Sequence, residues 1–124
     1  MASSKLKGLV AFAHVSDVPS SIEFYLVLGF AVDHTFCPPG SEEPTWVHLQ
    51  SENAHLMLAR ASEPVIPEQQ AVLFYLYFSD IEAKYRELKQ LGIDVGEMTY
   101  PPFCPKGEFR VYDPDGYCLM LTHV

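Results

Sequence analysis

An internal repeat at a spacing of 63 residues constrains this 124-residue chain more than any other feature. Three pairs of segments match at this spacing without a gap. They are 16–18 with 79–81 (Ser-Asp-Val and Ser-Asp-Ile), 28–30 with 91–93 (Leu-Gly-Phe and Leu-Gly-Ile), and 56–58 with 119–121 (Leu-Met-Leu in both). Similarity at one fixed spacing indicates a structural unit that occurs twice. The sequence therefore predicts one domain over residues 1–124, with module one at about 6–62 and module two at about 71–124.

The first module is expected to fold as βαβββ. Apolar and polar residues alternate over 6–16, which indicates a strand. A helix start is expected at 17–20, with Pro19 in the first turn and Ser20 or Ser21 as candidate N-caps, and the helix is expected to end at Gly29. The remaining expected elements are a strand around 30–37, an acidic, proline-rich loop at 38–44, and a hairpin of strands 45–50 and 54–61.

The second module repeats this order after a link at 62–70. The expected elements are a strand at 72–79, a helix at 80–91, a strand at 93–100, a loop at 101–107 and a hairpin at 109–121. The hairpin turn is marked by residue types: Asp113 caps its own backbone, Pro114 fixes φ and Gly116 accepts a positive φ. Each apolar sheet face is too large for one short helix to cover. The predicted class is α+β, with two tandem βαβββ modules forming a curved mixed sheet around a cleft.

Charge and cysteine content exclude several classes of partner. Eight Lys and Arg stand against sixteen Asp and Glu, and the net charge of −8 repels phosphate backbones and anionic membranes. We therefore expect neither a nucleic acid nor a membrane partner. The odd set of Cys37, Cys104 and Cys118 lacks metal-like spacing and favours a reducing compartment. No stretch resembles a membrane span or a signal peptide, so the expected location is cytoplasmic.

Four short motifs carry a family resemblance that covers nearly the whole chain. They are His-Val-Ser-Asp at 14–17, Ser-Ile-Glu-Phe-Tyr at 21–25, Leu-Gly-Phe at 28–30 and Asp-Pro-Asp-Gly-Tyr at 113–117. With these motifs the chain resembles the vicinal oxygen chelate superfamily, which contains glyoxalase I, extradiol dioxygenases, fosfomycin-resistance enzymes and bleomycin-resistance binding proteins. The resemblance implies the two-module fold. It does not imply one activity, because this fold hosts unrelated functions.

The resemblance also locates the four positions at which enzymes of the superfamily hold a divalent metal. Counting from the motifs places them at Val10, Met57, Leu73 and Met120. Val and Leu have no donor atom, and a thioether is a soft ligand that does not suit a hard divalent cation. The resemblance therefore implies that the family's metal site is absent, with no metal and no cofactor expected, and we nominate no catalytic residue.

Members of the superfamily without the metal resemble this chain in length and acidity, and they sequester a cationic glycopeptide in a groove of a homodimer. The resemblance thus implies a homodimeric protein that binds a hydrophobic or cationic small molecule, such as an antibiotic. Aromatic faces for stacking and negative charge suit that task. The candidate ligand-binding residues are Phe12, His14, Trp46, His48, Met57, Tyr75, Tyr77, Phe109 and Met120.

Other hypotheses remain open. The aromatic residues also suit packing in a core or dimer interface. A glyoxalase-like lyase or dioxygenase-like metalloenzyme is the main alternative, with a relocated site built from His14, His48 and His55 and with Glu108 as a carboxylate partner. A module that binds a protein partner is a third. The side of the sheet on which Trp46, His48 and Phe109 lie depends on the hairpin turns, since a slip of one residue moves them to the other face. Nothing in the sequence suggests a function for His34 or His123.

Overall fold

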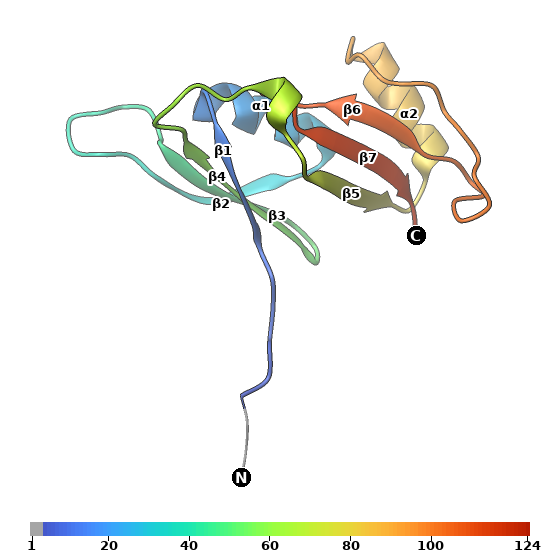
Figure 1. The fold of residues 1–124 in the computed structure, drawn as a ribbon, viewed down its shortest axis with the longest axis horizontal. Helices are drawn as coiled ribbons and strands as arrows, with labels where there is room; N and C mark the ends of the chain where they lie inside the picture. The colour runs from blue at the N-terminus through green and yellow to red at the C-terminus, as the bar shows by residue number, and fades with distance from the viewer. Residues whose placement is uncertain (1–3) are drawn as a thin grey trace. The chain divides into compact units, whose positions relative to one another are not determined.

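The computed structural model describes residues 4–124, which form two helices, one short 3₁₀ helix and seven strands. The chain divides into two compact units, Met1–Ser62 and Glu63–Val124. Each unit contains one helix and one sheet that mixes parallel and antiparallel pairing (Figure 1), so the α+β class and the tandem modules are confirmed. Within the described residues, no helix is both long and apolar enough to cross a membrane.

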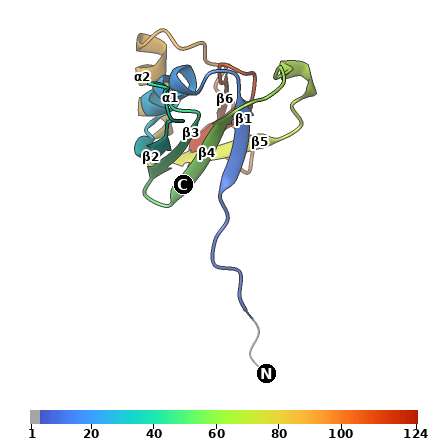
Figure 2. The same ribbon diagram turned by 90° about the vertical axis from the view of Figure 1, so that its left-hand side faces the viewer.

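Unit 1 is a four-stranded sheet with a helix on one face (Figure 2). Its elements are β1 (Ala11–Val15), α1 (Val18–Leu28), β2 (Ala31–Phe36), β3 (Trp46–Ser51) and β4 (Ala54–Arg60). The strand order is β1-β4-β3-β2, with β1 parallel to β4 and the other pairs antiparallel. Alternate residues such as Val15, Val47 and Leu58 are buried, and α1 contacts β2, β3 and β4. The core of unit 1 thus lies between α1 and one face of the sheet.

The first strand and the helix start differ from expectation. Residues 4–10 have no regular structure, so β1 begins at Ala11 rather than at residue 6. The N-cap of α1 is Asp17, whose Oδ1 accepts a hydrogen bond from the backbone N–H of Ser20 at 3.3 Å. The prediction of Ser20 or Ser21 as the cap is therefore wrong, because the nearer carboxylate takes this role. The helix ends at Gly29, as predicted, with a φ of 122°.

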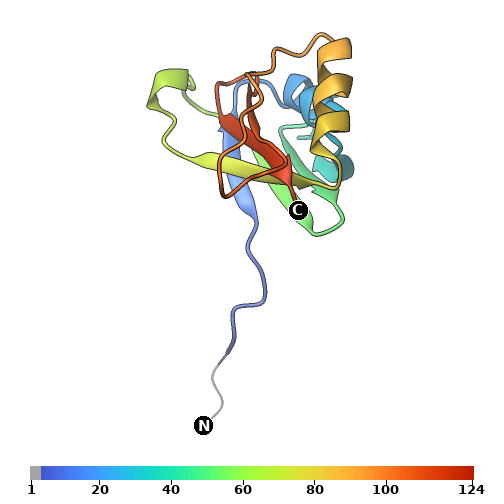
Figure 3. The same ribbon diagram turned by 90° about the vertical axis from the view of Figure 1, so that its right-hand side faces the viewer.

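Unit 2 is a three-stranded sheet covered by the second helix (Figure 3). Its elements are a 3₁₀ turn (Pro67–Gln69), β5 (Leu73–Phe78), α2 (Ile81–Gln90), β6 (Phe109–Tyr112) and β7 (Cys118–His123). The strand order is β5-β7-β6, with β5 parallel to β7 and β6 antiparallel to it. Ile81 and Leu88 of α2 are buried, and the helix contacts β5 and β7.

The strand predicted over residues 93–100 does not form. Two isolated bridges occur there instead, from Val95 to Val111 and from Thr99 to Glu108. Gly96 lies between them, and glycine in a strand interior weakens pairing because it adds chain entropy and no packing. The segment follows the edge of β6 without becoming a continuous strand.

The turn between β6 and β7 forms as predicted. Asp113 Oδ1 accepts hydrogen bonds from the backbone N–H groups of Asp115 and Tyr117, both at 2.9 Å. Gly116 has a φ of 86° and donates its N–H to the Asp113 carbonyl at 2.9 Å. Pro67 packs against Gly116 so closely that a Cβ added there would lie 2.4 Å from the proline Cβ. The link before β5 therefore rests on this turn.

Candidate binding faces and a histidine cluster

The face of the unit 1 sheet opposite α1 carries aromatic, sulfur and imidazole side chains. Cross-strand register sets Phe12 beside Met57, Met57 beside His48, and His48 beside His34. Phe12 is about half exposed, and its ring meets the ring of His14 edge-on at a centroid distance of 5.3 Å. Because period-2 alternation puts every second residue on one side, β1, β3 and β4 all contribute to this open face.

Trp46 completes the predicted residues of this face. It pairs with Ala59 of β4, and the centroid of its ring lies 4.9 Å from that of His34. The structure therefore places all five candidates from the first module on one face: Phe12, His14, Trp46, His48 and Met57.

The open face of the unit 2 sheet carries a pair of stacked tyrosines. Tyr75 and Tyr77 are 43% and 62% exposed, and their rings lie 6.1 Å apart with an interplanar angle of 24°. Met120 of β7 pairs with Tyr75 of β5 and is buried. Three of the four candidates from the second module thus share this face.

Glu108 places a buried carboxylate next to this pair. It is only 8% exposed, and its Oε2 has no hydrogen-bond partner among the described residues. Partial desolvation raises the pKa of the Tyr75 phenol, and the charge of Glu108, the nearby Cys104 and a hydrogen bond to the Glu108 carboxylate raise that pKa further. A buried carboxylate oxygen without a partner is costly, so it favours a ligand group that donates a hydrogen bond or carries positive charge.

Phe109 does not join the other candidates. It is 1% exposed, and its ring meets that of Tyr85 in α2 at 4.9 Å with an interplanar angle of 76°. Its side chain is therefore part of the core under α2, and the expectation that it faces the ligand is wrong. The longer turn at residues 113–117 sets a pairing in which Phe109 opposes Leu121, another core residue.

The four positions that the family resemblance assigns to a metal are held by apolar side chains. Val10 and Leu73 are partly exposed, Met57 lies on the open face of unit 1, and Met120 lies on that of unit 2. None of these side chains supplies an oxygen or nitrogen ligand.

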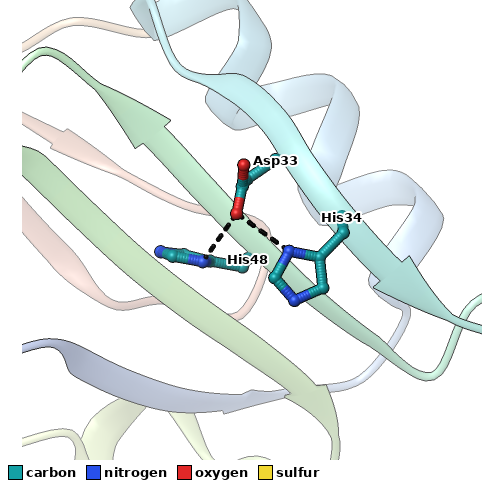
Figure 4. Close-up of side chains that lie close together, drawn as sticks. All are labelled: Asp33, His34 and His48. Carbon is teal, nitrogen blue, oxygen red and sulfur yellow. Dashed lines mark hydrogen bonds and ion pairs between the residues drawn. The ribbon is translucent and has the colours of Figure 1, made fainter.

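A cluster that sequence reasoning missed lies on the open face of unit 1 (Figure 4). Asp33 Oδ2 lies 2.8 Å from Nδ1 of His34 and 3.2 Å from Nδ1 of His48. On its other side, His48 Nε2 lies 3.1 Å from Nδ1 of His55. The metal site predicted from the sequence contains His48 and His55 but neither Asp33 nor His34, and its remaining histidine, His14, lies outside the three-residue cluster. No local motif could have revealed the cluster, because a bulge in β2 creates it.

Comparison with solved structures shows a shared fold. The chain is similar to a bleomycin-binding protein in complex with bleomycin (21% identity, 96% of this chain and 99% of that chain, TM-score 0.73). It is similar to TnmS3, an antibiotic-binding protein from Streptomyces sp. CB03234 (22% identity, 99% and 98%, TM-score 0.73). It also resembles a protein named SMU.1112c (29% identity, 96% and 100%, TM-score 0.75).

Sequence comparison agrees with the fold. No curated protein sequence matches the chain. The model of one family, described as the glyoxalase/bleomycin resistance protein/dioxygenase superfamily, matches residues 9–121. Since this match covers nearly the whole chain, the protein belongs to the glyoxalase/bleomycin resistance protein/dioxygenase superfamily.

Proposed function

We propose that this protein binds a small aromatic or cationic molecule on the open face of a sheet, with no metal at the family's four ligand positions. The observation that carries the proposal is the exposed Tyr75–Tyr77 pair beside the buried carboxylate of Glu108. Aromatic faces stack on flat rings and attract cations, and a carboxylate forms strong hydrogen bonds with cationic donors. The chain's net charge of −8 favours the approach of such a ligand.

The relatives support an antibiotic as the class of ligand. One similar structure is a bleomycin-binding protein and another is an antibiotic-binding protein. Metal-free bleomycin is therefore a suitable first probe, followed by a panel of aromatic cations. The alternative, a glyoxalase-like or dioxygenase-like enzyme, requires an activity that depends on a divalent metal.

The first experiment is a calorimetric titration of chelator-treated protein with metal-free bleomycin, in parallel with the fluorescence of Trp46. Saturable binding in the presence of EDTA is expected. Tyr77→Ala should weaken it about tenfold, which corresponds to about 1.4 kcal/mol of lost stacking. Tyr100→Ala is the matched control, because Tyr100 is equally exposed but lies outside the sheet. The proposal fails if neither bleomycin nor any aromatic cation binds or raises the melting temperature.

A second variant tests the carboxylate. Glu108→Gln keeps the shape of the side chain and removes its charge, so it should weaken a cationic ligand more than a neutral aromatic one of similar size. Equal loss of both ligands would show that Glu108 only supports the fold.

We further propose that the protein is a homodimer. Leu6 and Leu9 are apolar and exposed in the extended segment that precedes β1, and a second copy is a simple way to cover them. Light scattering of the full chain is expected to give twice the monomer mass, and Leu6→Asp with Leu9→Asp should shift the mass toward the monomer. A monomer at tens of micromolar would contradict the proposal.

A cytoplasmic location is also part of the proposal. Cys37, Cys104 and Cys118 are all free thiols, as a reducing compartment favours. Fractionation of the native host with an antibody to the protein would test the location directly.

A further inference from the structure

A bulge in β2 brings three potential metal ligands together. β2 and β3 pair Val32 with Leu49 and then His34 with His48, which leaves Asp33 as an extra residue. Neighbouring residues of a regular strand point to opposite faces, but a bulge re-aims one of them. Asp33 and His34 therefore both reach the side of the sheet where His48 lies, as Figure 4 shows.

The spacing of the three ligand atoms fits a small metal site. Asp33, His34 and His48 each offer one ligand atom, and the three atoms lie within 4.8 Å of one another. Tetrahedral bonds of about 2.0–2.1 Å would place neighbouring ligand atoms roughly 3.3 Å apart. The separations of 2.8 Å and 3.2 Å from Asp33 are close to this value, so small side-chain rotations suffice.

The donor set selects a class of metal. Two imidazole nitrogens and one carboxylate oxygen suit Zn²⁺, Ni²⁺ and Cu²⁺. Mg²⁺ and Ca²⁺ take oxygen ligands and would find one carboxylate here. Three protein ligands leave at least one coordination position for water or an external ligand.

Neighbouring side chains hold both imidazoles in place. His48 Nε2 lies 3.1 Å from His55 Nδ1, so His48 can bind a metal through Nδ1 while its Nε2–H donates to His55. Metal-binding histidines commonly make such a second hydrogen bond. The ring of His34 lies against that of Trp46 at 4.9 Å. Much of the orientation that a metal requires is thus set by the fold.

A surface ion-pair network is the competing explanation. The side chains of His34, Asp33 and His48 are 61%, 36% and 19% exposed. Ion pairs with this exposure contribute little to stability, so they do not account for a bulge that interrupts the β2–β3 ladder. The same exposure leaves a path for a hydrated ion to enter.

We propose that Asp33, His34 and His48 bind one first-row divalent transition metal, such as Zn²⁺ or Ni²⁺, with His55 as the hydrogen-bond partner of His48. This site uses none of the family's four ligand positions. The expected absence of a metal therefore applies only to the family's four ligand positions. The proposed metal site does not depend on the aromatic ligand proposed above.

The test is a calorimetric titration of chelator-treated, tag-free protein with Zn²⁺ and with Ni²⁺. One equivalent per chain is expected. His48→Ala should abolish binding, while Asp33→Asn and His34→Ala should each weaken it at least about tenfold; His55→Ala should weaken it about 10- to 100-fold. His123→Ala is the matched control, because it removes a histidine of unit 2 and should bind the metal like the unchanged protein. Circular dichroism melts of each metal-free variant confirm that it folds.

Two results would overturn the proposal. The first is no binding at 1:1 stoichiometry. The second is binding that His48→Ala and Asp33→Asn leave unchanged, which would identify adventitious sites elsewhere on the acidic surface. Electron paramagnetic resonance of the Cu²⁺-loaded protein gives an independent readout, with coupling to two imidazole nitrogens expected and loss of one in His34→Ala.

Discussion

Both modules contain a strand, a helix and a closing hairpin, yet the first strand of the hairpin faces opposite ways in the two modules. Trp46 in β3 and Phe109 in β6 are 63 residues apart. Trp46 lies on an open face, whereas Phe109 is buried under α2. Glu52 and Asn53 alone join β3 to β4, while residues 113–117 join β6 to β7. This shifts the pairing by one residue and reverses every side chain of β6. A repeat can therefore conserve elements without conserving facing.

A second contrast concerns one position in the segment that follows each helix, which is β2 in unit 1 and residues 93–100 in unit 2. Asp33 is the extra residue of the bulge in unit 1, and its carboxylate contacts two histidines. Gly96 is the residue 63 positions later. It donates its N–H to the Arg110 carbonyl at 2.8 Å, and an added Cβ would lie 3.3 Å from that oxygen. The position supplies a side-chain ligand in one unit and a close backbone contact in the other.

The largest expected effect tests the opposite facings. Phe109→Ala should lower the free energy of unfolding by about 3–5 kcal/mol, because it empties a fully buried site beside Tyr85. Trp46→Ala should cost less than about 2 kcal/mol, since part of that ring already meets water. Urea unfolding followed by circular dichroism measures both. Similar costs at the two positions would contradict the difference in facing.

The next effect concerns the turn of unit 2. Gly116→Ala should lower the free energy of unfolding by about 2–4 kcal/mol, because the new Cβ adds a clash with Pro67 to the strain of a positive φ. Gly40→Ala is the matched control in unit 1. Its φ is +82°, but nothing lies within 4 Å of the added Cβ, so only the strain of about 1–2 kcal/mol applies. Equal losses would mean that the Pro67 contact relaxes freely.

A smaller effect of opposite sign is expected in the short turn of unit 1. Glu52 has a positive φ of 48°, which is unfavourable for a side chain of this type. Glu52→Gly should therefore raise the free energy of unfolding by about 0.5–1 kcal/mol, because relief of strain exceeds the added chain entropy. Asn53→Gly, in the same turn, gains no relief and should be neutral or destabilising. A melting temperature that falls in Glu52→Gly would refute this account.

The smallest effect concerns the titration of Tyr75 on the open face of unit 2. Partial desolvation and the charge of Glu108 raise the pKa of its phenol above 10.0. The neutral phenol therefore stabilises the fold below pH 10, and this contribution is lost as pH rises through the folded pKa. Glu108→Gln should lower the pKa of Tyr75, whereas Glu97→Gln should not. Carbon-13 NMR of labelled tyrosine, assigned with Tyr75→Phe, measures it. An unchanged titration in Glu108→Gln would show that the carboxylate does not act on Tyr75.

Local signals were sufficient wherever one short segment decides its own conformation. Gly29 ends α1 and Asp113 organises its turn, as their residue types predict. Two of the failures also have local causes. Asp17, and not Ser20 or Ser21, caps α1. Gly96 weakens strand pairing in a segment whose flanking residues are typical of a strand.

The sequence by itself determined the repeat, two modules that each combine a strand, a helix and a closing hairpin, and the face on which Phe12, Tyr75 and Tyr77 lie, because period-2 patterns and turn residues act within a few residues of each other. Only the tertiary structure decided that Phe109 enters the core and that Asp33 and His34 meet His48. Both depend on the register between paired strands. A different turn length changes this register and turns the side chains of a strand to the opposite face of the sheet. One extra residue in a strand brings together side chains that no local sequence pattern connects.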